Sequence, residues 1–165
     1  MVAVSVEITD WDKIVRKYGK TAADNALKRG LRAGTDSAAD MVKGRIGNHV
    51  VTGFMRSSIK GDVQSPREGK TYAAIGSGVY YTRFVEEGTG IYGKGGKPIV
   101  ARRARAMAWH PRTATGAPIK KGGKVVRRSV KGQRPVGMFK QTFALDRAKM
   151  VDAFVRGFRS SFFTG

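Results

Sequence analysis

Residues 79–90, VYYTRFVEEGTG, join two regions of the chain that differ in charge. Tyr81, Phe84 and the valine that follows recur at helical spacing, which predicts a short amphipathic helix with its aromatic side chains in the core. Gly88 is expected to end this helix, because glycine readily adopts the left-handed conformation that closes one. The two glutamates just before Gly88 are the last acids until Asp146, and every residue in between is neutral or basic.

The composition favours one strongly basic domain. With 165 residues, the chain has the length of a single domain with a sizeable core, so we expect one domain over 1–165 with a basic extended loop at 91–134. Its 32 basic and 12 acidic residues give a net charge of +20, which attracts polyanions without specifying a fold. Nucleic acid, an acidic protein surface and an anionic membrane are each compatible with this charge, as is a solvated basic surface held near acidic subunits.

Three features that the sequence lacks restrict the classes of protein to which it can belong. The chain has no cysteine, which excludes disulfides and thiolate chemistry and fits a cytosolic origin. No apolar run reaches the roughly 20 residues that span a bilayer. The N-terminus lacks the basic and apolar pattern of a secretory signal. We therefore expect no membrane partner.

The N-terminal part of the sequence predicts a strand and two helices. Alternating apolar residues indicate a strand at 2–8, and a helix is expected at 11–18 with Asp10 as its cap. A long helix at 20–46 follows, in which Gly30 and its neighbouring small residues allow another helix to approach closely. The expected buried face of the long helix is Leu27, Leu31, Ala38, Met41, Val42 and Ile46.

The middle of the chain predicts a hairpin after a helical turn. In TGFMRSSI, Thr52 can cap one turn, with Phe54 among the side chains expected in the core. Strands are expected at 59–64 and 71–76, joined by a polar loop. The other core residues expected here are Met55 and Ile59.

The segment 91–134 contains no acid. Short apolar runs at 106–109 and 125–126 predict a second hairpin, with a long basic tip at 112–124 that orders against a partner. The candidate contacts to a polyanion or a partner are Arg102, Arg103, Arg105, Arg112, Lys120, Lys121, Lys124, Arg127 and Arg128.

One last helix is expected at 138–163, because apolar residues recur along it at helical spacing. Its aromatic end, 158–163, is more apolar than a solvated terminus, so we expect it to dock on a neighbouring subunit. The expected apolar face is Phe143, Ala144, Met150, Val151, Phe154, Val155, Phe158 and Phe162.

The sequence offers no convincing catalytic or metal-binding pattern. His49 and His110 are far apart and lack the spacing of a metal site. Glu86 and Glu87 are adjacent, so they cannot face each other as a glycosidase pair. We expect one of the two to meet an arginine and the other to be solvated. The glycine-rich run at 93–97 lacks the spacing of a phosphate-binding loop.

No cofactor, no metal and no enzymatic activity are therefore expected. Two classes of function remain open on the residues alone. One is a nucleic-acid-binding module, in which the basic segment contacts phosphates and Trp109 stacks on bases. The other is a structural subunit whose basic loop reaches an adjacent protein or packaged DNA.

Three motifs together resemble one family. TGFMRSSI (52–59) is similar to a TGxLRxSI signature, with Met55 in the leucine place. VYYTRFVEEGT (79–89) is similar to a YAxYVExGT signature, with Thr82 where alanine is common. VKGQRPVGMF (130–139) resembles a QxPxPFL signature, although Gly-Met-Phe replaces its last three residues. The order and spacing resemble the small tail-completion or head–tail connector proteins of long-tailed bacteriophages, the gene-product-ten family of HK-type phages, over roughly residues 20–155.

The resemblance implies an α+β fold: a curved antiparallel sheet packed on a long N-terminal helix, with a C-terminal helix and a long basic loop or hairpin. It implies no catalysis. It also implies structural or interface roles for the motif residues, which fix the turn before the sheet and anchor the helix that launches the basic loop. These residues are Thr52, Gly53, Arg56, Ser58, Tyr80, Tyr81, Phe84, Glu86, Gly88, Thr89, Pro135 and Phe139.

The same resemblance implies a location and partners. It places the protein in the virion, in the neck of the phage tail, after assembly in the host cytoplasm. The expected form is a homo-oligomeric ring, sixfold by analogy with tails or twelvefold nearer the portal. Its expected partners are neighbouring neck, connector and tail-tube proteins, with DNA in the channel as a further candidate. A tail terminator, a tail-tube subunit and a sequence-independent DNA-binding protein are the alternatives.

Overall fold

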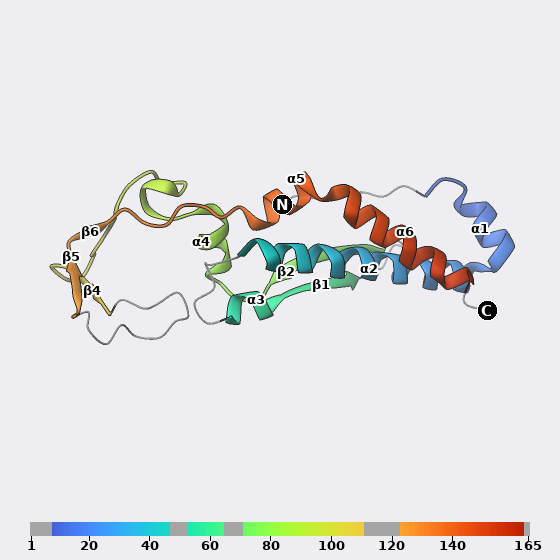
Figure 1. Cartoon of the computed structure of the whole chain (residues 1–165), viewed down its shortest axis with the longest axis horizontal. Coiled ribbons are helices and arrows are strands. Elements are labelled where there is room, and N and C mark those ends of the chain that lie inside the picture. The colour runs from blue at the N-terminus through green and yellow to red at the C-terminus, as the bar shows by residue number, and fades with distance from the viewer. Residues whose placement is uncertain (1–7, 47–52, 65–70, 111–122, 164–165) are drawn as a thin grey trace. The chain divides into compact units, whose positions relative to one another are not determined.

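The computed structural model describes residues 8–46, 53–64, 71–110 and 123–163 (Figure 1). The chain forms two compact units, and each is described by itself. The helical unit comprises Met1–Val42, Ile59–Gly76 and Lys140–Gly165, and the arm unit comprises Lys43–Ser58 and Ser77–Phe139. The expected α+β class is confirmed. The expectation of a single domain over 1–165 stays a prediction.

The first two helices have the predicted bounds. Helix α1 spans Trp11–Tyr18 and α2 spans Lys20–Ile46. Gly19 separates them with a φ of 83°, a value that only glycine adopts without strain. Asp10 is the N-cap residue of α1 as predicted, but its side chain makes no cap hydrogen bond and instead forms an ion pair with Lys13.

Helix α2 packs against the C-terminal helix through small residues of the helical unit. A methyl group at Gly30 would lie 2.9 Å from the Phe154 ring, and one at Gly157 would lie 2.7 Å from the Ala33 side chain. The predicted close approach at Gly30 is therefore confirmed. The buried face differs in detail, since Leu27, Leu31 and Met41 are only half-buried. The fully buried residues of α2 are Ala23, Ala26, Gly30, Thr35, Ala38, Ala39, Val42 and Ile46.

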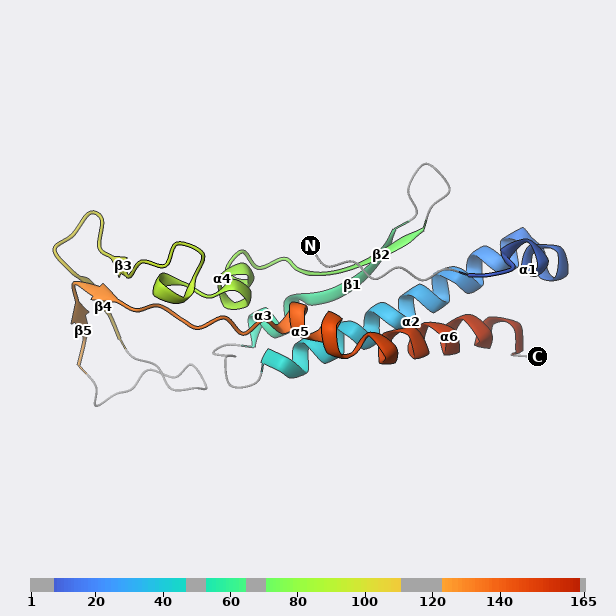
Figure 2. The same cartoon turned by 90° about the horizontal axis from the view of Figure 1, so that it is seen from above.

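A two-stranded sheet covers another side of α2 in the helical unit (Figures 1 and 2). Strand β1, Ile59–Gln64, pairs with β2, Tyr72–Ser77, close to the predicted bounds. Gly61 lets β1 approach α2 closely, because a Cβ there would lie 2.7 Å from Thr35. The Thr35 hydroxyl is satisfied within its own helix, where it donates to backbone carbonyls one turn earlier. Helix α2 therefore lies between the hairpin and the C-terminal helix.

The expected single C-terminal helix is two helices. Helix α5 spans Met138–Leu145 and α6 spans Arg147–Phe163. Asp146 lies between them, is 7% exposed and pairs through its carboxylate with Lys149 at 2.9 Å. A buried charge needs such a partner, and Lys149 supplies it next to the break between α5 and α6. The expected apolar face is confirmed in part, since Met150 and Phe154 are buried and Ala153, which was not predicted, is buried with them. The prediction is wrong for Ala144, which is exposed, and the other expected residues are half-buried, namely Phe143, Val151, Val155, Phe158 and Phe162.

The aromatic end of α6 finds a partner within its own chain. The Phe162 ring lies 4.2 Å from the Tyr18 ring of α1, between ring centroids, and Phe158 lies 5.4 Å from Phe162. Aromatic pairs at these separations are favourable beyond the area they bury. The docking of this end on a neighbouring subunit therefore stays a prediction.

The described part of the arm unit contains three short helices and several short strands. Helix α3 spans Phe54–Ser58, α4 spans Thr82–Glu87, and a 3₁₀ helix, η2, spans Gly90–Tyr92. Its buried apolar residues include Met55 and Val79. The prediction that the motif aromatics lie in the core is wrong for three of them. The exposed fractions are 62% for Phe54, 84% for Tyr80 and 47% for Phe84.

Four short strands form the rest of the arm unit. Strand β3, Ile99–Val100, pairs with β6, Ser129–Val130, and β4, Met107–Trp109, pairs with β5, Val125–Arg127. Both pairs are antiparallel. The predicted second hairpin is therefore confirmed, and the β3–β6 pair was not predicted. We call residues 91–134 the arm.

Several expectations concern parts of the chain outside the described residues. These are the strand at 2–8, of which only residue 8 is described, Thr52, the loop at 65–70 and residues 111–122 of the basic tip. Within the described residues, no helix is long and apolar enough to cross a membrane.

Candidate functional site

Two of the sequence motifs lie side by side in the arm unit and are joined by backbone hydrogen bonds. The N–H of Thr89 donates to the carbonyl of Gln133 at 2.8 Å, and the N–H of Ile91 donates to Lys131 at 2.8 Å. The Gln133 N–H in turn donates to the Thr89 hydroxyl at 2.9 Å. These bonds hold the outgoing and returning ends of the arm together. We call this contact between residues 85–91 and 131–139 the motif junction.

Glu86 extends the motif junction to the start of α5. The N–H of Gly137 donates to the Glu86 carbonyl at 3.2 Å, and the N–H of Phe139 donates to the Glu86 carboxylate at 3.1 Å. A carboxylate near the first turn of a helix satisfies backbone donors and opposes the positive end of the helix dipole. The prediction that one glutamate pairs with an arginine describes Glu87, which lies 3.6 Å from Arg83. The prediction that the other glutamate is solvated is wrong, because the Glu86 side chain is half-buried at the start of α5.

Glycines make this close approach sterically feasible. Gly88 has a φ of 79°, and a Cβ there would lie 2.9 Å from the Pro135 ring. Gly90 and Gly132 have φ values of 65° and 94°, and added Cβ atoms would overlap the carbonyls of Lys131 and Thr89 respectively. Backbone, unlike a side chain, cannot rotate away. The ends of the arm therefore require glycine at these positions.

A chain of hydroxyl groups links the first two motifs. The Ser58 Oγ lies 2.6 Å from the Ser77 Oγ, which lies 2.7 Å from the Thr82 Oγ1. The N–H of Val79 also donates to the Ser77 Oγ at 3.2 Å. Thr82 is only 6% exposed, so its hydroxyl needs this partner. The threonine that departs from the resembled signature is therefore accommodated by a specific hydrogen bond.

Substitution of Ser77 tests this link. Ser77→Ala is expected to lower the free energy of unfolding by about 1–3 kcal/mol, because it leaves neighbouring polar groups without their partner. The matched control is Ser57→Ala, since the exposed Ser57 hydroxyl bonds only a carbonyl within its own turn. The control is expected to change stability by less than about 0.5 kcal/mol. Urea unfolding followed by circular dichroism measures both, and equal effects would show that Ser77 links nothing.

The exposed motif residues form a different surface. Tyr80 contacts Tyr81 edge to face with ring centroids 5.6 Å apart, and Arg83 lies 6.0 Å from the Phe84 ring centroid. The Arg56 side chain is also exposed. Exposed aromatic residues with arginine beside them are enriched where proteins contact one another. These residues are therefore better suited to contact another protein than to stabilise the core of this one.

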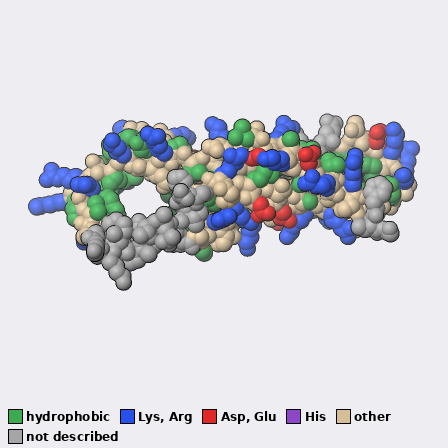
Figure 3. All heavy atoms as spheres, viewed as in Figure 1, with side chains coloured by type: hydrophobic (Ala, Val, Ile, Leu, Met, Phe, Trp, Pro, Cys, Tyr) green, Lys and Arg blue, Asp and Glu red, His purple; other side chains and the backbone are tan. Residues whose placement is uncertain are grey.

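The arm carries its basic side chains in solvent. Basic side chains are prominent on the face of the molecule shown in Figure 3, including the strands of the arm. Trp109 and Val126 are 40% and 56% exposed. The described candidate contacts are all exposed, namely Arg102, Arg103, Arg105, Lys124, Arg127 and Arg128. Arg112, Lys120 and Lys121 lie outside the described residues.

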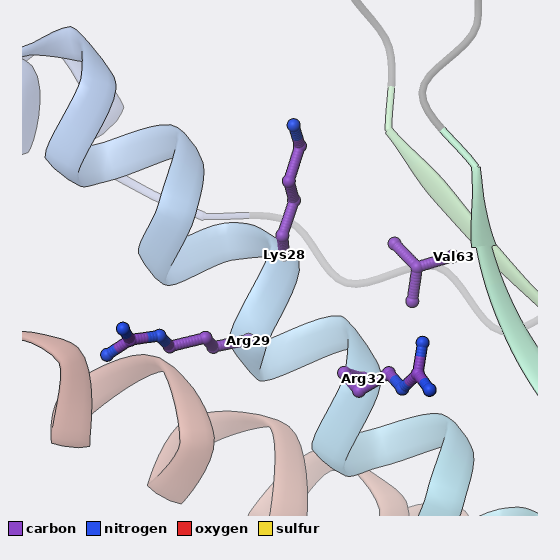
Figure 4. A pocket seen from close by; sticks show the side chains of 4 residues that line it. All are labelled: Lys28, Arg29, Arg32 and Val63. Carbon is purple, nitrogen blue, oxygen red and sulfur yellow. The ribbon is translucent and has the colours of Figure 1, made fainter.

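The described residues form an open hollow but lack a cluster of side chains that could hold a metal ion. They contain no group of three or more histidine, cysteine or acidic side chains that could hold a metal ion. His110 is exposed, and His49 lies outside the described part. An open hollow of about 350 Å³ is lined by Lys28, Arg29, Arg32 and Val63 (Figure 4).

The comparison with known families agrees with these observations. Residues 12–88 match the HK97-gp10-like family, described as "Bacteriophage HK97-gp10, putative tail-component". The matched segment, which is slightly less than half of the chain, is similar to this family. This description names a component of a bacteriophage tail. No individual curated protein and no solved structure matches the chain.

The match confirms the family resemblance over a shorter stretch than expected. It includes the TGFMRSSI motif and all but the last residue of VYYTRFVEEGT, whereas VKGQRPVGMF lies beyond residue 88. The structure nevertheless brings the third motif against the second. Among the residues named in advance, Glu86, Gly88, Thr89, Pro135 and Phe139 meet at the motif junction, and Ser58 joins the hydroxyl chain.

Sequence reasoning missed Ser77 and Gly132. Ser77 stands outside the quoted motifs and had no signal of its own. Gly132 lies inside VKGQRPVGMF, where a glycine among polar residues could have been noticed as a candidate for positive φ. Gly53, half-buried with a φ of 72°, begins the turn of α3 as the motif suggested.

Proposed function

We propose that the protein is a ring-forming subunit of the phage neck that joins the DNA-filled head to the tail. The observation that carries this proposal is the motif junction within a protein of the tail-component class. It fixes both ends of a long basic arm to one rigid point. An arm held in this way can reach an adjacent ring while the body stays in its own. The mechanism is passive assembly, without catalysis.

Ring formation needs two different surfaces on each subunit, because closed head-to-tail rings use heterologous contacts. The exposed aromatic residues of the arm unit supply a candidate for one of them. Tyr80 lies just before α4 and Phe84 lies within it, on the segment that leads into the arm. We place these side chains at the contact between neighbouring subunits, in a sixfold ring by analogy with tails. Twelvefold symmetry would apply nearer the portal.

The motif residues have structural roles in this proposal. Gly53, Ser58, Glu86, Gly88, Thr89 and Pro135 shape the root of the arm, and Arg56 belongs to the turn before the hairpin. The partners are neighbouring neck, connector and tail-tube proteins. A tail terminator or a tail-tube subunit would use the same features at another level of the tail. A sequence-independent DNA-binding protein is favoured only by the basic charge of the arm.

Particles made without this protein test the proposal. Phage that lack its gene are expected to accumulate DNA-filled heads and separate tails, and purified protein added to that lysate is expected to restore joined particles. Electron microscopy counts joined and separate particles. Normal joined particles without the protein would contradict the proposal, and so would tails of the wrong length with intact necks, which would indicate a terminator.

A further inference from the structure

The two strand pairs of the arm enclose an insertion on one strand only. Val100 pairs with Ser129 and Met107 pairs with Arg127. The partner strand has Arg128 alone between these two pairs, whereas the first strand has residues 101–106, ARRARA. The extra residues must bulge out of the ladder, as in other β-bulges that redirect side chains. We call this feature the arginine bulge.

The bulge gathers arginines that are distant in the sequence. Its members are Arg102, Arg103 and Arg105 in the insertion between β3 and β4, and Arg128 between β5 and β6. All four side chains are exposed, and Arg127 follows next to them in β5. The strand pairs on both sides bring these like charges into one short stretch of the arm, where they repel one another. The arrangement is therefore expected to gain stability from an anion at the bulge.

A second copy of the chain is a poor source of that anion. The arm contains 13 of the 32 basic residues and none of the 12 acids, so the rest of the chain carries 19 basic against 12 acidic residues. Both parts are positive, and copies gathered in a ring repel one another. Neutralisation has to come from a different molecule with a high density of negative charge.

We propose that the arginine bulge binds the phosphate backbone of duplex DNA. Duplex DNA carries one negative charge per roughly 1.7 Å of helix axis. Arginine suits this partner because its planar guanidinium donates two parallel hydrogen bonds to a phosphate. The strands beside the bulge form a two-stranded antiparallel ribbon, an element that the major groove of B-form DNA admits.

The observations favour DNA over an acidic protein surface. The chain has no acid from Gly88 to Leu145, so nothing near the bulge can select the mixed charges of a protein surface. Contacts to phosphates alone carry no sequence information, and the expected binding is therefore independent of sequence. The inference deepens the proposed function by naming the partner of the arm. It rests on that function only for the location in the particle at which the arm contacts DNA.

The experiment compares two full-length variants with equal charge. The arm variant carries Arg102→Gln, Arg103→Gln, Arg105→Gln and Arg128→Gln. The control variant carries Arg16→Gln, Lys20→Gln, Lys28→Gln and Arg29→Gln, all exposed in α1 and α2, and two of them line the hollow in Figure 4. Fluorescence anisotropy measures the binding of a labelled duplex of random sequence at several salt concentrations.

The natural protein is expected to bind the duplex, and the arm variant is expected to bind at least tenfold more weakly. If each removed arginine contacts one phosphate, the slope of log affinity against log salt falls by roughly 3 to 4. The control variant is expected to lose less than about threefold. Equal losses in both variants would overturn the inference, since binding would then follow net charge. Absence of binding at low salt would overturn it too.

A competition experiment and a head–tail joining assay distinguish failure of this inference from failure of the proposed function. Polyglutamate that displaced the protein as well as unlabelled duplex would indicate an acidic protein surface and contradict the choice of DNA. An arm variant that lost DNA binding but still joined heads to tails would support the inference and show that joining does not depend on it. Retained DNA binding in the arm variant, with joining lost, would overturn the inference and leave the neck function standing.

Discussion

A Gly132→Ala substitution is expected to detach the returning strand of the arm from the segment after α4. Gly132 has a φ of 94°, and a Cβ there would overlap the backbone carbonyl of Thr89. The strain at positive φ and the overlap with backbone add, so the loss of stability at the motif junction should reach about 2–5 kcal/mol. Hydrogen exchange of the Thr89, Ile91 and Gln133 amides measures this loss directly.

The matched control for this substitution is Gly96→Ala. Gly96 also has positive φ, 58°, but nothing lies within 4 Å of the added methyl group. Its cost is confined to backbone strain of about 1–2 kcal/mol, and the amides of the junction should stay protected. Similar exchange rates at the junction in both variants would mean that the contact between Gly132 and Thr89 does not hold the arm.

The double substitution Tyr80→Ser and Phe84→Ser is expected to abolish ring formation while the monomer stays folded. The two side chains are 84% and 47% exposed, so their loss opens no large cavity in the monomer. A few buried aromatic residues usually dominate the free energy of an interface, and each can contribute 2 kcal/mol or more. Native mass spectrometry should show rings for the natural protein and monomers for the variant at the same concentration.

Tyr72→Ser is the control for the ring experiment. Tyr72 is 49% exposed on β2, in the helical unit, where its hydroxyl donates to Gln64. This variant is expected to form rings like the natural protein, because the residue lies outside the proposed contact. Rings that persisted in the double variant, or that were lost equally in the control, would place the subunit contact elsewhere.

The helices of the N-terminal half could be predicted because local signals there are strong. Gly19 separates α1 from α2, and the spacing of small and apolar residues over 20–46 is compatible only with a helix. The break at Asp146 could not be predicted in the same way. The apolar spacing continues across it, and the burial of the Asp146 carboxylate beside Lys149 has no signal in that spacing.

The candidate site was predictable only in part. Periodicity identified α4 but could not say which of its faces is buried, because a helix of less than two turns gives too short a pattern. The aromatic side chains were placed in the core on hydrophobicity alone, which is a one-way rule, since apolar residues also make up much of a protein surface. The buried positions proved to be Val79 and Thr82.

The motif junction has no local signal. Its bonds join residues that are far apart in the sequence, such as Glu86 and Phe139, and nothing in either segment predicts the other. The family resemblance indicated that both segments matter, without giving their contact. The positive φ values at Gly88, Gly90 and Gly132 supply the physical reason why glycine recurs in both.

The measurement that tests the central claim most directly is a cryo-electron microscopy reconstruction of the intact particle. The neck assignment predicts a single closed ring of copies at the boundary between head and tail, with the helical unit recognisable from α2 and α6. It also predicts that the arm extends from its own ring to an adjacent component. Copies repeated along the tail tube, or a particle that lacks the protein altogether, would contradict the assignment.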